Sequence, residues 1–264
     1  MKIGCCLGMN AVTEPRIGHE AIPLMAELGF DYVELPLAQL MELSEKSFQE
    51  LLNRIKTSGI PVDANNNFFP ASVRLTGENA DLNKALDYAK HAVQRTAAMG
   101  AKIIVLGSTG AKNIPLGFPY ERAMDQLLEL LSKLQDLVQP AGITVALEAI
   151  NSQESNFIIS VTEAHNIVKK LSLENIKLLA DYYHMRMENE DQKIILNTGK
   201  DLRHIHIAAK NGRLFPLPND NEDYKKFFAL LKNTGYNGRI SIEAFSKNLA
   251  KDSAESLKYL RSYQ

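Results

Sequence analysis

Four ionisable side chains lie at or near the ends of segments that are otherwise apolar. Glu148 occurs in ITVALEAI, Asp181 ends IKLLAD, His206 occurs in LRHIHIAA and Glu243 occurs in RISIEAF. A charge buried in such a segment needs a cation or several hydrogen-bond donors to replace its lost hydration. Three carboxylates and one imidazole together suit Mn, Co, Mg or Zn. We therefore predict that these four side chains bind one divalent metal ion.

The third of these segments contains two histidines, and we expect only one of them to be a ligand. His204 and His206 are separated by one residue, so on a strand both side chains point to the same face. His206 is closer to the carboxyl end of the segment, where the other candidate ligands lie. We predict that His206 binds the metal and that His204 is a deeper packing or supporting group.

Three more polar residues follow the ends of these segments. His184 occurs in ADYYH, Glu154 in EAINSQE and Arg213 in AKNGR. Their positions place them in the loops after the predicted strands. Together they would supply hydrogen-bonding groups around the metal, which suits a polyhydroxylated ligand.

The elements that must position these residues are short apolar runs rich in β-branched residues. Near-continuous apolar runs are typical of parallel strands covered on both faces. We predict strands at residues 2–7, 31–35, 61–65, 102–106, 143–149, 176–181, 202–208 and 239–244. In barrel enzymes the chemistry lies at the carboxyl ends of such strands, which is where the candidate ligands occur.

Amphipathic helix-length segments separate the strands, for example residues 18–29, 44–59, 80–100 and 120–142. The residues predicted to cap their carboxyl ends in a left-handed conformation are Gly29, Gly59, Gly100 and Gly142. Repeated β-then-α units without a linker indicate a (β/α)8 TIM barrel of the α/β class, a single domain over residues 1–264. A doubly wound sheet is the alternative. However, no G-x-G-x-x-G follows the first strand and no G-x-x-x-x-G-K-[ST] occurs, so we expect no nucleotide cofactor.

The composition argues against several classes of partner. The 264 residues include 30 Lys+Arg and 31 Asp+Glu, so no basic field favours nucleic acid or a membrane surface. No run approaches the roughly 20 apolar residues of a membrane span, and the opening MKIGCCLGMN is typical of a strand. Cys5 and Cys6 are neighbours and would point to opposite faces of a strand, which disfavours a disulfide. We expect a cytoplasmic protein with two buried thiols.

The same residues fall in four motifs that resemble those of one enzyme superfamily. L-E-x-x-N-x-x-E appears as LEAINSQE, D-x-x-H-M as DYYHM, H-x-H…R as HIHIAAKNGR and G-Y-x-G-x-[IV]-x-[IV]-E as GYNGRISIE. The opening KIG and the segment AELGFDYVEL fit as well. The sequence therefore resembles the sugar isomerase/epimerase superfamily with a xylose isomerase-like TIM barrel, and within it the D-tagatose or D-psicose 3-epimerase branch.

The resemblance implies a role for each residue. The four that would bind the metal are Glu148, Asp181, His206 and Glu243, with Mn²⁺ preferred and Co²⁺, Mg²⁺ or Zn²⁺ as alternatives. Glu148 and Glu243 would double as the acid and the base. The residues that would contact the sugar near its carbonyl end are Glu154, His184 and Arg213. The chain would be an isomerase acting on a sugar or keto-polyol and would form a dimer or tetramer, with neither nucleic acid nor a membrane as a partner.

The part of the sequence that would select the substrate departs from the pattern of this branch. The segment after Arg213 reads LFPLPND where the branch commonly has a Pro-Gly-x-Gly turn, and the chain has no tryptophan. Ser152 replaces an arginine of the motif. Asn65, Asn66 and Asn67 stand where small residues are more usual. The metal-binding motifs are intact, so these differences predict a remodelled substrate pocket.

The candidate residues support proton transfer beside a carbonyl. A metal held by such ligands can chelate two adjacent oxygens of a ketose and stabilise an enediolate. One glutamate would remove the proton from the carbon α to the carbonyl, and a second on the opposite face would return one. Return to the same carbon gives the epimer, and return to the neighbouring carbon gives an aldose–ketose isomer.

Several alternatives stay open. A metal-dependent lyase or dehydratase acting on an inosose-like keto-polyol or a keto-glycoside begins with the same proton abstraction. An endonuclease IV-like phosphodiesterase would need further His and Asp ligands that the early strands do not supply. A non-catalytic sugar-binding barrel would not need both glutamates. A phosphorylated substrate is a further alternative, because the loops after the last two predicted strands contain Lys210, Arg213, Ser246 and Lys247.

Overall fold

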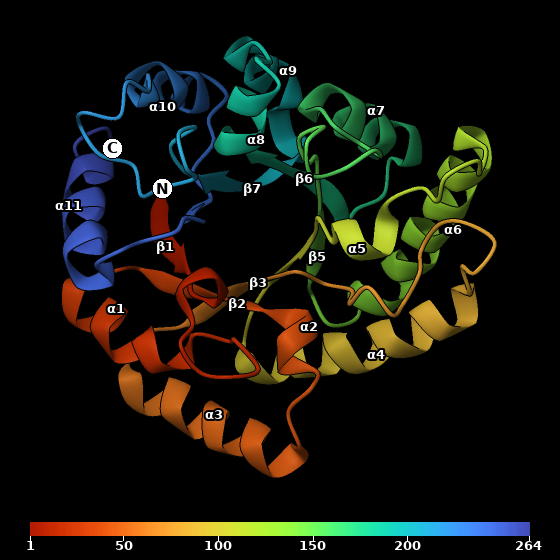
Figure 1. Cartoon of the computed structure of the whole chain (residues 1–264), viewed down its shortest axis with the longest axis horizontal. Helices are drawn as coiled ribbons and strands as arrows, with labels where there is room; N and C mark the ends of the chain where they lie inside the picture. Colours follow the sequence, from red (N-terminus) through yellow and green to blue (C-terminus); the bar gives the residue numbers. More distant parts are fainter.

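Eight parallel strands hydrogen-bond in sequence order, and the last pairs with the first, so the sheet closes into a barrel (Figure 1). The computed structural model describes residues 1–264. The strands are β1 (Lys2–Cys6), β2 (Tyr32–Pro36), β3 (Val62–Asn66), β4 (Ile103–Leu106), β5 (Thr144–Glu148), β6 (Ile176–Asp181), β7 (Leu202–Ile207) and β8 (Arg239–Ile242). All eight predicted strands are present, and the predicted (β/α)8 TIM barrel is confirmed.

The longer helices surround the barrel and each buries one face. They are α1 (Ile22–Leu28), α3 (Glu45–Ser58), α4 (Leu82–Met99), α6 (Tyr120–Val138), α7 (Val161–Leu171), α10 (Tyr224–Asn233) and α11 (Leu249–Arg261). In α6, for example, Ala123, Leu127 and Leu134 are buried at helical spacing. The short helices are α2 (Leu37–Leu40), α5 (Thr109–Lys112), α8 (Tyr182–Met187) and α9 (Ile195–Thr198), and 3₁₀ turns occur at Gly8–Asn10, His19–Ala21, Gln192–Ile194 and Gly199–Asp201.

Three of the four predicted helix-capping glycines are confirmed. Each adopts a left-handed conformation directly after its helix, as the absence of a Cβ allows: Gly29, Gly59 and Gly100. The prediction for Gly142 was wrong, because α6 already ends at Val138. Pro140 follows that end and cannot continue the helix, so Gly142, with a φ of 62°, lies in the turn before β5.

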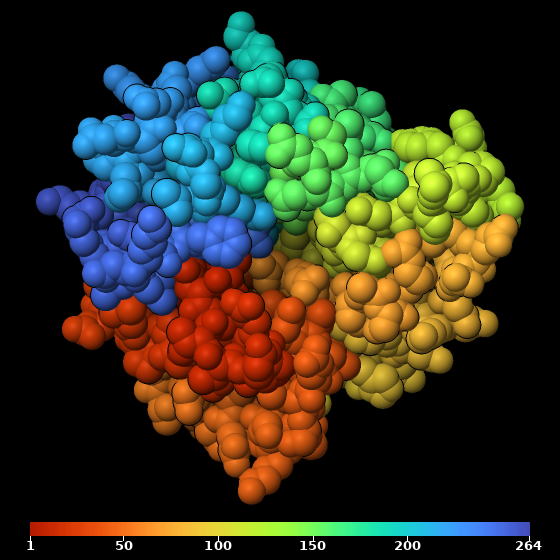
Figure 2. All heavy atoms as spheres, in the orientation of Figure 1, coloured from red at the N-terminus to blue at the C-terminus, as the bar shows by residue number.

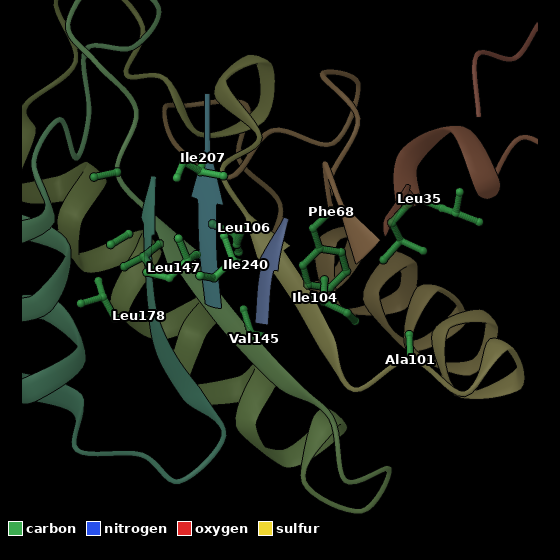
Figure 3. Packing of buried hydrophobic residues seen from close by; sticks show 14 of the residues in the cluster. Leu35, Phe68, Ala101, Ile104, Leu106, Val145, Leu147, Leu178, Ile207 and Ile240 are labelled. Carbon is green, nitrogen blue, oxygen red and sulfur yellow. The ribbon is translucent and has the colours of Figure 1, made fainter. Parts of the chain in front are cut away.

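Alternation along the strands divides the core into two layers. Residues that point outward pack between strands and helices in a cluster of 66 buried residues. Figure 3 shows members of this layer, including Leu106 of β4 and both Val145 and Leu147 of β5. The residues between them point inward and form a smaller cluster inside the barrel, made of Ala64, Ile103, Val105, Ala146 and Leu179.

The inward positions become polar towards the carboxyl ends of the strands. On β5 the inward Ala146 is followed by Glu148, and on β6 the inward Leu179 is followed by Asp181. The loops and short helices that follow the strands cover this end of the barrel, as α2, α5 and α8 show (Figure 1). In Figure 2, segments from the start, middle and end of the chain meet around the middle of the face shown.

Two further expectations concern the cysteines and the membrane. Cys5 and Cys6 are both buried free thiols, as predicted. No helix in the structure combines the length and the apolar character needed to cross a bilayer.

Candidate metal centre

The four predicted ligands meet at the carboxyl end of the barrel. One ligand atom from each of Glu148, Asp181, His206 and Glu243 lies within 4.8 Å of the others. The four residues are between 0% and 8% exposed. His206 lies centrally, because its Nδ1 is 3.1 Å from Glu148 Oε1 and 3.2 Å from Glu243 Oε2.

Strand register explains why residues far apart in the sequence converge. Asp181 of β6 is directly opposite His206 of β7, and His206 is opposite Ser241 of β8. Glu243 follows Ser241 at the next inward position, one layer closer to the mouth of the barrel. On every strand, alternate residues point into the barrel. Inward-pointing residues near the carboxyl ends of neighbouring strands therefore meet at the same mouth of the barrel.

Asp181 has two separate contacts. Its Oδ1 accepts a hydrogen bond of 2.7 Å from the backbone N–H of Tyr183, which caps the start of α8. Its Oδ2 points into the cluster, where it is buried and has no hydrogen-bond partner. One carboxylate thus fixes the first turn of a helix and presents its second oxygen to the cluster.

The cluster fits a divalent cation. An unpartnered buried carboxylate oxygen is costly, and Asp181 Oδ2 would be satisfied by a metal–oxygen bond. Three carboxylates within 4.8 Å of one another would also repel without a cation. Oxygen donors with one imidazole nitrogen are a ligand set that suits Mn²⁺, Co²⁺, Mg²⁺ or Zn²⁺.

Burial has the largest single influence on the carboxyl groups. It raises the pKa of Asp181 to about 6, although the charges of Arg213 and His206 oppose it. It also raises the pKa of Glu148 against a hydrogen bond from His206. For Glu243, burial is outweighed by the charges of His206 and Arg213 together, which hold its pKa well below the usual range. Carboxyl groups perturbed in opposite directions are typical of functional sites.

Arg213 is a positively charged side chain that faces this cluster. Its Nη2 forms an ion pair with Glu243 Oε2 and lies 3.6 Å from Asp181 Oδ2. Its Nη1 lies 3.6 Å from Glu154 Oε2, and its guanidinium stacks 4.8 Å above the Tyr183 ring. Arg213 has a φ of 51°, a left-handed conformation in the turn that directs it back over the strand ends.

His184 and Glu154 are linked through Asn151. Asn151 Nδ2 lies 2.7 Å from His184 Nδ1 and donates a hydrogen bond of 2.8 Å to Glu154 Oε1. The Nε2 of His184 is buried without a hydrogen-bond partner, 3.5 Å from Asp181 Oδ2, and burial lowers the pKa of His184 to about 4. The prediction of a loop for His184 was wrong, since α8 begins directly after β6 and includes this residue. Glu154 and Arg213 lie in turns, as expected.

Three of the four residues considered for phosphate binding have partners within the chain. Arg213 faces carboxylates, and Ser246 Oγ donates to Asp252 Oδ2 at 2.6 Å. Lys210 Nζ donates instead to Asn189 Oδ1 at 3.3 Å. These contacts give no support to a phosphorylated substrate.

Two neighbours of the glutamates were not predicted to contact them, although Asn66 belongs to the asparagine run that we expected in the substrate pocket. Asn66, at the end of β3, donates a hydrogen bond of 2.7 Å to Glu243 Oε1. Gly107, just after β4, is packed against Glu148, because a Cβ at Gly107 would lie 2.1 Å from Glu148 Oε2. The Asn65–Asn67 run was the available signal for Asn66, whereas nothing in the sequence distinguishes Gly107 from other glycines.

Two buried charges were also missed. Glu34 lies inside the barrel beneath His206 and is 0% exposed. Its position in the apolar segment DYVELP was a signal, but it is in the middle of a strand rather than at the end. Lys112 is also 0% exposed, and its Nζ donates to Phe157 O at 2.6 Å and Ser155 Oγ at 3.1 Å.

Similarity to known proteins covers nearly the whole chain. A family model described as "Xylose isomerase-like TIM barrel" matches residues 22–263. A ketose 3-epimerase of Arthrobacter globiformis is 25% identical over 251 residues, which cover 94% of this chain and 85% of that protein. A 3-dehydro-D-guloside 4-epimerase of Escherichia coli strain K12 is 25% identical over 271 residues, covering 99% and 100%. A crystal structure of D-psicose 3-epimerase with D-tagatose from Clostridium cellulolyticum H10 has the same fold, with a TM-score of 0.87 at 20% identity over 100% of this chain and 99% of that one.

Proposed function

The chain belongs to the xylose isomerase-like TIM barrel family, and from that premise we propose that it is a divalent-metal-dependent epimerase of a ketose or a related keto-sugar. Two relatives support this proposal, a ketose 3-epimerase and a 3-dehydro-D-guloside 4-epimerase. Both names describe inversion at a carbon next to a carbonyl. The reaction class is therefore the movement of a proton α to a carbonyl.

The observation that carries the proposal is a pair of glutamates sharing one metal-sized cluster. Glu148 and Glu243 each place one carboxylate oxygen close to His206 Nδ1. Their other oxygens face different strands, because Glu148 Oε2 lies against Gly107 and Glu243 Oε1 accepts from Asn66. Two carboxylates that approach one point from different strands can exchange protons with opposite faces of a bound substrate.

We propose that the residues act as follows. Glu148, Asp181, His206 and Glu243 hold one divalent cation, with Mn²⁺ preferred. When bound, this cation supplies Lewis-acid stabilisation of negative charge that develops on the substrate oxygens. One glutamate removes the proton next to the carbonyl, and the other returns a proton from the opposite face to the same carbon, which inverts it.

We propose that Arg213, His184 and Glu154 orient the sugar. Arg213 is held over the strand ends by ion pairs and by the ring of Tyr183, so its remaining donors are directed towards substrate oxygens. His184 Nε2 is buried with no hydrogen-bond partner, 3.5 Å from Asp181 Oδ2, and can bond a hydroxyl there. Glu154 is partly exposed and can accept from another hydroxyl. Such fixed groups position the reacting carbon between the two glutamates.

A substrate screen tests the reaction class. Free ketoses, keto-glycosides and keto-polyols would be incubated with the protein and Mn²⁺, Co²⁺ or Mg²⁺, and the products identified by NMR. We expect inversion at the carbon next to the carbonyl and no net loss of water. Formation of a dehydrated product would show that the protein is a lyase rather than an epimerase. If no keto-sugar is turned over with any of the metals, the proposal is contradicted.

Exchange with deuterated water tests the two glutamates separately. We expect Glu148→Gln and Glu243→Gln each to slow deuterium incorporation into the substrate by about 10²- to 10⁴-fold. Glu188→Gln is a matched control, because Glu188 is a carboxylate on the loop side of the site that accepts from Ser152 and lies outside the cluster. Exchange at the unmodified rate in either of the first two variants would exclude that residue from proton transfer.

A further inference from the structure

A buried network of hydrogen bonds lies directly beneath the metal cluster, and its central residue is Glu34 of β2. Glu34 Oε1 is 3.0 Å from His206 Nε2, and Glu34 Oε2 is 2.7 Å from His204 Nε2. Ser241 Oγ donates to Glu34 Oε2 at 2.5 Å. Glu34, His204, His206 and Ser241 are all 0% exposed, so water does not compete for these contacts.

The network extends across strands on one side of the barrel. Because the Ser241 hydroxyl donates its proton to Glu34, the Tyr32 hydroxyl is the donor in its 2.8 Å contact with Ser241. The Tyr32 ring occupies the place where a Cβ at Gly4 would lie, at 2.4 Å, so β1 leaves room for this layer. Strands β1, β2, β7 and β8 are neighbours in the barrel and together enclose the network.

A purely structural role does not explain a carboxylate at this position. Inward positions of such barrels are normally filled by Val, Ile or Leu, and a buried charge is rarely more stable than a well-packed apolar residue. Glu34 instead has three polar partners, the two imidazoles and the Ser241 hydroxyl, which offset its lost hydration. The chain keeps this charge where it contacts the one imidazole of the metal cluster.

The two nitrogens of His206 therefore face different partners. Nε2 faces Glu34 Oε1, whereas Nδ1 faces the carboxylates of Glu148 and Glu243. A carboxylate that accepts from Nε2–H fixes the ring orientation and leaves the Nδ1 lone pair directed at the cation. Cys6 Sγ also contacts the same Nε2, at 3.9 Å, but a thiol sulfur is a weaker acceptor than a carboxylate.

We infer that Glu34 is a positioning residue for the metal centre, which holds His206 in the orientation and tautomer that bind the cation through Nδ1. His204 and Ser241 hold Glu34 in place by donating to its other oxygen. The inference rests on the proposed metal centre and adds to it a residue that lies outside the four-residue cluster and acts on it through His206.

The experiment compares Mn²⁺ affinity, measured by electron paramagnetic resonance, in the unmodified chain and in Glu34→Gln. Gln has one acceptor oxygen and one donor NH₂ group in place of two acceptor oxygens. It therefore cannot accept hydrogen bonds from both imidazoles and from Ser241 as Glu34 does. We expect the Mn²⁺ dissociation constant to rise by about 10- to 100-fold. Asp63→Asn is the control, since Asp63 is a buried carboxylate of β3 that pairs with Arg239 at 2.8 Å, away from His206. Its Mn²⁺ affinity should remain unchanged.

A second measurement uses only the unmodified chain, so it does not require that a variant folds. Nitrogen-15 NMR of the unmodified chain loaded with Mg²⁺ reports which nitrogen of His206 carries the proton, and we expect Nε2. A proton on Nδ1, or an unchanged Mn²⁺ affinity in Glu34→Gln, would overturn the inference while leaving the metal centre intact. If the unmodified chain binds no Mn²⁺, both the inference and the proposed metal dependence fail.

Discussion

Among single residues, Gly107 leaves the space that the Glu148 carboxylate occupies. Its backbone is not in the left-handed region, so an alanine is compatible with its conformation, but the new Cβ would lie 2.1 Å from Glu148 Oε2. The carboxylate would have to move away from the other ligands. This glycine is thus required by its neighbour rather than by its own backbone.

We expect Gly107→Ala to weaken Mn²⁺ binding by at least about 10-fold, comparable with the loss of a group that orients a ligand. Calorimetric titration with Mn²⁺ measures the effect. Gly110→Ala is the control, because its Cβ would meet Ala71 Cβ at 2.9 Å rather than a ligand. Equal losses of affinity in both variants would indicate a general disturbance of the loop and contradict the specific role of Gly107.

Lys112 predicts a pH dependence of stability. Burial lowers its pKa to about 8 from the ordinary value of 10.5, so the folded chain releases this proton first as the pH rises. Between these two pH values the unfolded state binds more protons, and the contribution of Lys112 to the free energy of unfolding therefore increases with pH. The shift corresponds to a change of about 3 kcal/mol.

To test this, the stability of the unmodified chain is compared with that of Lys112→Met, both in the presence of a chelator. We expect the free energy of unfolding of the unmodified chain, minus that of the variant, to rise between about pH 8 and pH 10. Denaturant titrations at several pH values provide both quantities. If this difference in the free energy of unfolding stays constant or falls over this pH range, burial does not destabilise the charged form of Lys112, and the prediction is contradicted.

The candidate ligands could be predicted from the sequence because each is a charge at the end of an apolar segment. Glu34 has the same character, but it lies in the middle of its segment, and only strand register shows that it faces His206. The contact of Asn66 with Glu243 joins residues that are 177 positions apart, so it depends on closure of the barrel. Local patterns identify which residues are unusual, whereas tertiary packing determines which of them touch.

Among the elements, helix α8 depends on a residue of the metal cluster. Asp181 ends β6 and caps α8 through Oδ1, while Oδ2 faces the other ligands. The helix in turn carries His184 towards the site. The sequence could predict the strand but not this helix, because six residues are too short for a recognisable amphipathic repeat.

Asp181→Asn and Asp181→Ala separate the two contacts of this residue. Asparagine retains an N-cap acceptor and alanine does not, so without metal we expect Asp181→Ala to unfold with a free energy about 1 kcal/mol below that of Asp181→Asn. Both variants should lose most of their Mn²⁺ affinity. Chemical denaturation with a chelator measures the first effect. Equal stability of the two variants would contradict the capping role.

For the whole molecule, closure of the barrel brings three carboxylates together, and under the proposed function a bound cation would relieve their mutual repulsion. The alternation of the strands and the number of β-then-α units were sufficient to predict this fold. The exact ends of α6 and the identity of the residues inside the barrel were not predictable, because they depend on turn geometry and register.

Metal binding should therefore stabilise the whole fold. A ligand that binds only the folded state adds about 2.7 kcal/mol when its concentration is 100 times its dissociation constant. We expect Mn²⁺ to raise the melting temperature and a chelator to lower it, as followed by circular dichroism. The Asp181→Asn variant should show little response, and a full response in that variant would place the cation elsewhere.

The central claim is that four side chains from four neighbouring strands hold one divalent cation. The most direct measurement is the number of Mn²⁺ ions bound per chain, obtained by equilibrium dialysis of the metal-free protein. We predict one tightly bound ion for the unmodified chain and its loss in both Asp181→Asn and His206→Asn, with Glu188→Gln unchanged. Undiminished binding in Asp181→Asn and His206→Asn, or no tight binding in the unmodified chain, would contradict the claim.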